Sequence, residues 1–288
     1  MKKIIVIGNG FDIDLGWRTS YGDFYHEHVN GWDRMAKQGD NLARYVINHA
    51  GENWYDFERT IYDYCLRKSK EELSEKQMYE DLRDYMAFKN QLEAFVTERS
   101  KEPINENSMA YKILEYFLEE NSHTNTSSDI RPQLFSFNYT PLSMVAKQIK
   151  PNVVFNYTAI HGTVEKKNCI FGFQDDPNIK GDYRLMQKSI DDNYDSHGLL
   201  PTIMDAGKIM FFGLSMGPID AVYFKDLFEM ISKPGDFNHR KKMEIEFVTK
   251  DADSKRDIKL NLQSIGINIQ SLMQNNKVSF TYTSNVNK

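Results

Sequence analysis

Cysteine is scarce in this chain, and its scarcity bears on two classes of protein. Cys65 and Cys169 are the only two cysteines among 288 residues, and they form no Cys-x-x-Cys pair. A zinc site built from four cysteines is therefore excluded, and a disulfide framework is not expected. We expect both cysteines to be buried thiols, and we expect no metal cofactor.

Long apolar runs and an excess of positive charge are also absent. No stretch approaches the roughly 18 apolar residues that a membrane-spanning helix needs, and the apolar run before Gly8 is too short for a signal peptide. The formal net charge is -5, whereas a surface for nucleic acid or for an anionic membrane needs clustered positive charge. We therefore expect a cytoplasmic protein that binds neither nucleic acid nor a membrane.

The apolar residues are numerous enough for a sizeable core, because 40% of the chain is hydrophobic and 13% is aromatic. Short apolar segments bounded by helix and strand breakers predict strands at Lys3–Ile7, Leu134–Phe137, Val153–Ile160, Lys208–Phe212 and Met243–Val248, with an edge strand at Val278–Tyr282. Helical patterns separate these strands. The sequence therefore predicts an α/β fold, a Rossmann-like parallel sheet with helices on both faces.

The middle of the chain lacks strand patterns and carries charged and aromatic residues at helical spacing. An apolar stripe at steps of three and four contains Tyr79, Leu82, Tyr85, Met86, Leu92, Phe95 and Val96. The pattern repeats at Tyr111–Glu120, and the polar stretch Asn121–Asp129 is expected to be a loop. We predict a Rossmann-like nucleotide-binding core of residues 1–30 and 130–288, with a helical insertion of residues 31–129.

The first predicted strand runs directly into a glycine-rich turn. Gly8 and Gly10 lack a Cβ, so the backbone can approach a pyrophosphate, and the N–H groups that begin the next helix face an anion. The dinucleotide fingerprint needs a glycine where Ile13 stands, and the third glycine comes only at Gly16. Two interpretations stay open, a nucleotide site that includes Asn9 and Asp12, or a tight strand-to-helix turn.

Two further polar residues follow predicted strands, and so fall at the carboxyl edge of a parallel sheet, where ligands bind. Asn138 can hold a ribose hydroxyl or a water, or it can cap a helix that starts near Pro141. His161 titrates near neutrality and can act as a general base, and the adjacent Gly162 permits a sharp turn. A single histidine at a strand end is also compatible with a purely structural role.

Gly213 and Ser215 follow the strand pattern at 208–212 and suit a phosphate or a ribose. The residues from Gly213 to Gly217 also form a Gly-x-Ser-x-Gly sequence, as in the serine hydrolases. Pro218 follows it directly, and only His239 is available downstream as the histidine of a triad. The pattern therefore favours ligand binding over a serine nucleophile.

Several segments together resemble the AbiH family of bacterial abortive-infection proteins. They are the opening 6–24, which contains Phe11-Asp12 and Thr19-Ser20-Tyr21, and then 54–58, 135–140, 160–162, 170–172 and 212–215. The resemblance spans nearly the whole chain. It implies a role in antiphage defence, in which an infected cell stops growing or dies before the phage matures, and it does not supply a reaction.

A more distant similarity is to sirtuin-like domains that consume NAD. It rests on the order of Gly8, Gly10 and Gly16, then Asn138, His161-Gly162, and Gly213 with Ser215. The similarity implies that Asn138 positions a water or the ribose and that His161 acts as the base. Three departures stand against it: Thr140 replaces an Asp of the sirtuin motif, the Asp-Phe-Arg that follows the sirtuin glycine turn has no copy in register because Asp23-Phe24 comes four residues late, and the zinc module is absent. NAD binding is therefore better supported than NAD hydrolysis, and deacetylation is not expected.

The resulting prediction is an antiphage effector that binds NAD or a related nucleotide and hydrolyses its N-glycosidic bond. The predicted catalytic residues are Asn138 and His161, and the predicted NAD-binding residues are Gly8, Asn9, Gly10, Phe11, Asp12, Gly16, Gly213 and Ser215. The alternative is a nucleotide-sensing or interaction protein that binds without cutting. A nuclease built on Asp56 and Glu58 is disfavoured, because on a helix these carboxylates diverge. A phage or host trigger protein and a homo-oligomer are left open.

Overall fold

The computed structural model describes residues 2–36, 41–53, 57–72, 74–122, 131–153, 155–195, 198–233 and 242–285. The chain divides into two compact units. The sheet unit comprises Met1–Trp17, Pro103–Ile160 and Ser196–Lys288, and the helical unit comprises Arg18–Glu102 and His161–Asp195. The domains that the sequence predicts, 1–30 with 130–288 and 31–129, have other limits, since the helical unit begins at Arg18 and takes in a second segment.

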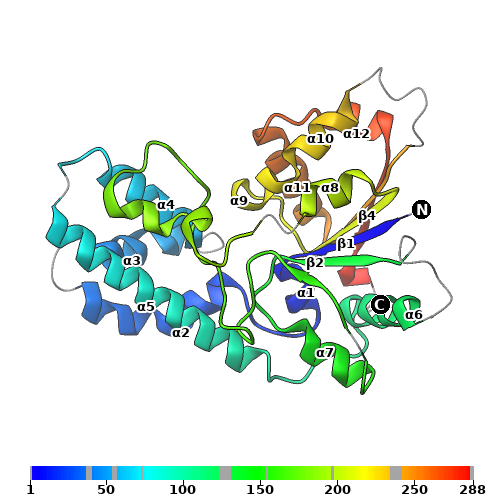
Figure 1. Cartoon of the computed structure of the whole chain (residues 1–288), viewed down its shortest axis with the longest axis horizontal. Coiled ribbons are helices and arrows are strands. Elements are labelled where there is room, and N and C mark those ends of the chain that lie inside the picture. The colour runs from blue at the N-terminus through cyan, green and yellow to red at the C-terminus, as the bar shows by residue number, and fades with distance from the viewer. Residues whose placement is uncertain are drawn as a thin grey trace. The chain divides into compact units, whose positions relative to one another are not determined.

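The sheet unit is built on six strands in the order β3-β2-β1-β4-β5-β6 (Figure 1). The strands are β1 (Lys3–Ile7), β2 (Gln133–Ser136), β3 (Thr158–Ala159), β4 (Lys208–Phe212), β5 (Glu244–Thr249) and β6 (Lys277–Tyr282). All five neighbouring pairs are parallel. This is the strand order of the doubly wound dinucleotide-binding folds, and the predicted fold class is confirmed.

Alternate residues of the strands supply two separate apolar cores, as a sheet covered on both faces requires. Ile4 and Val6 of β1 belong to one core, and Ile5 and Ile7 belong to the other. The first core is completed by helices α8 (Leu199–Met204), α9 (Pro218–Ala221), α10 (Lys225–Ser232), α11 (Ala252–Ser264) and α12 (Ile269–Asn275). The second is completed by α1 (Asn9–Asp14), α6 (Met109–Ser122) and α7 (Leu142–Ile149). Figure 1 shows these two layers of helices on either side of the strands.

Most of the strand predictions are confirmed, including the edge position of β6. The strand predicted over Val153–Ile160 is wrong in length, because only Thr158 and Ala159 pair with β2. The backbone turns at Asn152, where φ is 67°. Phe155 and Tyr157 instead pack as partly buried side chains against the second core. Residue 154 and most of the loop predicted at 121–129 lie outside the described residues.

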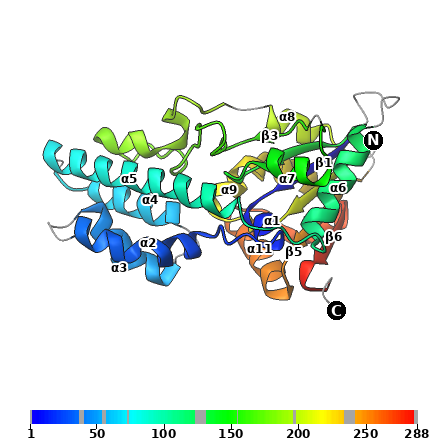
Figure 2. The same cartoon turned by 90° about the horizontal axis from the view of Figure 1, so that it is seen from below.

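The helical unit consists of α2 (Tyr21–Ala36), α3 (Leu42–Asn53), α4 (Phe57–Lys68) and α5 (Glu75–Arg99), with short 3-10 helices η1 (Gly181–Met186) and η2 (Lys188–Ile190). The four long helices lie side by side (Figure 2). An aromatic cluster of Phe24, Trp32, Phe57 and Phe88 fills the space between them, and all four rings are fully buried. Helices α2, α4 and α5 contribute rings to this cluster through apolar residues that recur with the helical period.

Helix α5 buries most of the predicted apolar stripe and exposes two of its residues. Tyr85, Leu92, Phe95 and Val96 are buried as expected, whereas Tyr79 is 71% exposed and Met86 is 48% exposed. Asp81 and Asp84 take part in the buried face instead, and both are 0% exposed. Two carboxylates inside a helix bundle need donors, and α3 supplies them at its N-terminus.

These two carboxylates accept hydrogen bonds from the backbone N–H groups at the N-terminus of α3. Asp81 accepts from the Leu42 N–H at 2.9 Å, and Asp84 accepts from the Ala43 N–H at 3.4 Å. Negative charge at the first turn of a helix is stabilised by the unpaired N–H groups and by the helix dipole. Asp81 also accepts from the Tyr64 and Tyr183 hydroxyls at 2.8 and 2.7 Å. Polar residues on α5 therefore join four segments of the helical unit.

Within the described part of the chain, every helix is too short or too polar to reach across a lipid bilayer. Cys65 and Cys169 are both buried thiols, as the sequence predicts. Burial raises the pKa of the Cys169 thiol to about 12, and it also raises the pKa of Cys65. Neither thiol is therefore a reactive nucleophile at neutral pH.

Candidate functional site

The strand order of the sheet unit reverses between β1 and β4, which makes the carboxyl ends of these two strands the place where doubly wound folds bind ligands. Gly8 links β1 to α1, Asn9 and Gly10 begin α1, and the turn after β4 contains Gly213 and Ser215. Five of the predicted nucleotide-binding residues thus follow two neighbouring strands. Their detailed geometry shows what each glycine does.

The glycines of the two turns are in contact with each other. The Gly8 N–H donates to the Phe212 carbonyl at 2.9 Å, and the Gly10 N–H donates to the Gly213 carbonyl at 2.9 Å. A Cβ added to Gly10 would lie 2.6 Å from the Cα of Gly213, and one added to Gly213 would lie 2.4 Å from the Phe11 nitrogen. Gly213 also has a φ of +66°, in the left-handed region. The absence of side chains here lets the two turns interlock.

Gly16 has a separate role, as the residue that ends α1. Its φ is +101°, its N–H donates to the Ile13 carbonyl, and the Trp17 N–H donates to the Asp12 carbonyl, each at 3.0 Å. These are the two bonds of a Schellman motif, which terminates a helix through a left-handed residue. The spacing of Gly16 from the first two glycines therefore follows from the length of α1.

A buried polar cluster joins the turn after β1 to the turn after β2. Nδ2 of Asn138 donates to the Gly8 carbonyl at 3.0 Å and to Oδ1 of Asp12 at 2.8 Å. The Thr140 hydroxyl donates to the same Asp12 oxygen at 3.2 Å. Asp12 is 1% exposed and Asn138 is 7% exposed. A carboxylate buried this deeply is stabilised by charge-assisted hydrogen bonds, and here an amide and a hydroxyl provide them.

The capping alternative for Asn138 is wrong. Helix α7 begins at Leu142 with Pro141 as its N-cap residue, and no side chain caps it. Thr140, which the sequence marks as a departure from the sirtuin motif, is the second donor to Asp12.

The remaining predicted residues of the sheet unit lie in different surroundings. The Phe11 ring is fully buried against Phe212, with the ring centroids 5.1 Å apart. Ser215 is exposed, and its hydroxyl accepts from the Gly217 N–H at 3.3 Å. The next residue, Met216, is fully buried with a φ of +54°. A left-handed backbone at a residue other than glycine is strained, and such strain concentrates at functional loops.

His161 belongs to the helical unit, and Asn138 to the sheet unit, so each is described with its own neighbours. His161 is buried beside an ion pair that is also buried. Nζ of Lys188 lies 2.9 Å from Oε2 of Glu58 and 3.5 Å from Nε2 of His161. The other Glu58 oxygen accepts from the Gly172 N–H at 3.2 Å. The side chains of Lys188 and Glu58 are 1% and 6% exposed.

Most of the chain matches one known protein family. A family model described as "Bacteriophage abortive infection AbiH" matches residues 4–237. The chain belongs to the AbiH family. Membership suggests an abortive-infection protein of phage defence and names no ligand or reaction. A search of curated proteins found no match to the chain. The sirtuin-like similarity stays a prediction.

Sequence reasoning did not select two residues of the polar clusters in this AbiH protein. Lys188 stands in a stretch with no motif, and a lysine is ordinarily exposed, so nothing in its pattern indicates burial. Glu58 was weighed only as one of a pair of nuclease carboxylates with Asp56, which lies outside the described residues. Its ion pair with Lys188 gives it another partner. The burial of a charged residue cannot be predicted from the local sequence when its ion-pair partner comes from a distant segment.

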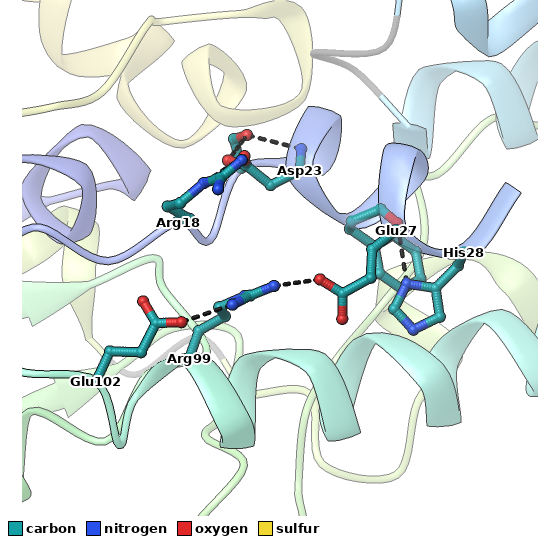
Figure 3. Close-up of polar contacts among 8 residues, drawn as sticks. Arg18, Asp23, Glu27, His28, Arg99 and Glu102 are labelled. Atoms are coloured by element: carbon teal, nitrogen blue, oxygen red, sulfur yellow. Dashed lines mark hydrogen bonds and ion pairs between the residues drawn. The ribbon is translucent and has the colours of Figure 1, made fainter.

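The helical unit also carries an exposed polar network between α2 and the end of α5 (Figure 3). Arg99 donates to Glu27 and to Glu102, and Arg18 forms an ion pair with Asp23 at 3.1 Å. The ring of His28 is hydrogen-bonded to the carbonyl of Phe24, one turn earlier. Exposed pairs of this kind contribute up to about 1 kcal/mol each. We therefore assign this network to helix packing in the AbiH protein and not to chemistry.

Proposed function

We propose that this AbiH protein is an abortive-infection effector that binds NAD or a related nucleotide at the carboxyl edge of its sheet and hydrolyses the N-glycosidic bond. The observation that supports this most directly is the buried cluster of Asp12, Asn138 and Thr140. It follows β1 and β2, beside the reversal of strand order at β1 and β4. The strained backbone of Met216 after β4 adds a second mark of a functional loop.

The chemistry that the cluster suits is cleavage with a positively charged transition state. The bond between C1′ of the ribose and the pyridinium nitrogen breaks, and its electron pair goes to that nitrogen, which yields neutral nicotinamide. A water oxygen bonds to C1′, the water loses one proton to solvent, and ADP-ribose is formed. The ribose carries oxocarbenium character in such a transition state, and a fixed carboxylate stabilises it. Asp12 would be that carboxylate, and Asn138 would hold it in place.

One observation favours a second candidate, a sensor that binds the nucleotide without cutting it. The Asn138 amide nitrogen has two hydrogens, and it already donates to two protein oxygens, on Gly8 and Asp12. In that case Asn138 shapes the site and does not touch a reacting group. A phage or host trigger protein and a homo-oligomer belong to the same proposal, since either would control when the proposed site is used.

Nicotinamide release decides between the two candidates. We would incubate the purified full chain with NAD, with and without lysate of phage-infected cells, and follow free nicotinamide and ADP-ribose by chromatography. If the chain is a hydrolase, wild type releases both products, and Asn138→Ala releases them about 100-fold more slowly, because it removes the amide donor that helps to fix Asp12. Wild type that binds NAD by calorimetry but releases no nicotinamide would reject hydrolysis and support the sensor.

The matched control is Asn276→Ala. Asn276 is also a buried asparagine of the sheet unit, and its amide donates to the Ile231 and Leu272 carbonyls at 2.9 and 3.1 Å. It precedes β6, at the amino edge of the sheet, so its loss costs hydrogen bonds without touching the proposed site. Equal activity loss in both variants would assign Asn138 to folding alone. Wild type that neither binds nor cleaves NAD, ATP or ADP-ribose would overturn nucleotide binding.

His161→Ala is tested separately, because the role of His161 as a base stays a prediction. A loss of nicotinamide release in this variant, with normal NAD binding, would support its participation. Unchanged release would remove it from the reaction and leave the proposal for the sheet unit standing.

A further inference from the structure

Lys188 is unusual because its ammonium group is buried inside the helical unit. Lysine is almost never fully buried unless it has a charged partner. Here the partner is Glu58, whose Oε2 lies 2.9 Å from Nζ of Lys188. A buried glutamate and a buried lysine at this distance hold opposite charges, because each compensates the loss of water around the other.

The position of Glu58 is fixed by the backbone on its other side. The Gly172 N–H donates to Oε1 of Glu58 at 3.2 Å. Gly172 has a φ of +137°, and a Cβ there would lie 2.1 Å from the Met186 carbonyl oxygen. Only glycine permits this close approach. The carboxylate is thus held by a backbone donor and in turn orients the Lys188 ammonium.

The ammonium of Lys188 determines which nitrogen of His161 carries the ring proton. An ammonium group has three donors and no acceptor, so Nε2 of His161, 3.5 Å from Nζ, can only accept. A neutral imidazole has one N–H, which must then be on Nδ1. A second ring proton would place two positive charges side by side in a site of low dielectric, which is strongly unfavourable.

We propose that Lys188, held by Glu58, is a positioning residue that keeps His161 neutral with its proton on Nδ1. Tyr85 on α5 also feels the Glu58 charge: its hydroxyl donates to the Phe171 carbonyl, and burial and the Glu58 charge raise its pKa. It stays neutral and adds no charge. His161 therefore offers a hydrogen-bond donor at Nδ1, and because Nε2 does not take up a proton, this inference speaks against the predicted role of His161 as a general base. Its use in NAD cleavage rests on the proposed function, whereas its protonation state does not.

Nuclear magnetic resonance of the histidine rings tests this inference on the full chain. We would label the seven histidines with 15N and record long-range correlations between about pH 5 and pH 8, the range in which ordinary histidines titrate. His161→Asn identifies the His161 signals by their disappearance. We expect an Nδ1–H ring whose signals do not shift with pH. A ring proton on Nε2, or a titration of His161 within this range, would overturn the inference.

The double variant Glu58→Gln with Lys188→Met tests the cause. It removes both charges together, so that neither is left buried alone. We expect the Nε2 resonance of His161 to shift, because its ammonium donor is gone, and an unmoved resonance would overturn the role of Lys188. The control is Lys89→Met, which breaks the neighbouring Lys89–Asp191 ion pair at 3.0 Å and should leave His161 unchanged. If the double variant fails to fold, the wild-type spectrum still tests the protonation state of His161. A failure to release nicotinamide would reject only the proposed function.

Discussion

At the scale of single residues, the structure shows glycine in two distinct roles in this AbiH protein, and both differ from the approach to a phosphate that the sequence suggests first. Gly10 and Gly213 allow two backbone turns to touch. Gly16 ends a helix in a left-handed conformation. A glycine that approaches a phosphate and one that approaches another loop have the same local sequence, because both requirements are simply the absence of a Cβ.

Gly213→Ala should therefore destabilise the protein far more than an ordinary glycine substitution. Gly213 combines a φ of +66° with backbone atoms 2.4 Å from the added Cβ, so we expect a loss of more than about 2 kcal/mol. Gly266→Ala is the control, since its φ is +93° but no atom lies within 4 Å of the added Cβ. It should cost about 1 kcal/mol, from the left-handed backbone alone. Urea unfolding of both variants measures the difference. Equal losses of unfolding free energy would contradict the close contact between the turns at Gly10 and Gly213.

At the scale of elements, the least predictable contact is the one between α5 and α3. Asp81 and Asp84 are buried on α5, whereas Tyr79 and Met86, which the apolar pattern also assigns to the buried face, are exposed. The error has a physical cause: the N–H groups at the start of α3 need acceptors, and that need comes from another helix. The strands other than β3 were predictable because each falls in a short, mostly apolar run between breakers, whereas cross-element polar contacts leave no local pattern.

Asp84 gives the helical unit a measurable pH dependence. Burial raises the pKa of Asp84 to about 6, although the Ala43 N–H and the Arg83 charge act in the opposite direction. The folded protein then holds this proton more tightly than the unfolded chain, so its contribution to stability is fully present below the unfolded pKa near 3.8 and is lost as pH rises through about 6. Asp84→Asn removes the charge at every pH.

We expect Asp84→Asn to gain stability relative to wild type at pH 7, by up to about 3 kcal/mol, and to lose this advantage near pH 4. Urea unfolding at several pH values measures the difference. Asp191→Asn is the control: burial acts to raise the pKa of Asp191, but hydrogen bonds from Asn193 and Lys89 lower it overall, so its effect should be nearly constant over the same range. An Asp84→Asn difference that does not vary with pH would contradict the assignment.

At the scale of the whole molecule, AbiH membership predicts an effect on infected cultures and not on free phage. A culture that expresses the chain should collapse when every cell is infected and should survive when few cells are infected, because infected cells die before releasing phage. Asn138→Ala should restore plaque formation, while Asn276→Ala, at the other edge of the sheet, should still protect. Efficiency of plating and culture density measure both. Full protection by Asn138→Ala would show that phage defence does not depend on the Asp12 cluster.

The central position of β1 also has a consequence for how the protein is made. β1 leaves the ribosome first, yet its sheet partners begin at Gln133 and Lys208. At roughly 5–20 residues per second, about 10 to 40 s pass before the strand that pairs with its second edge has been synthesised. During that time at least one edge of an apolar strand of high β-propensity is unpaired, which favours aggregation. Slowing translation should therefore reduce the yield of folded protein unless a chaperone covers the nascent chain.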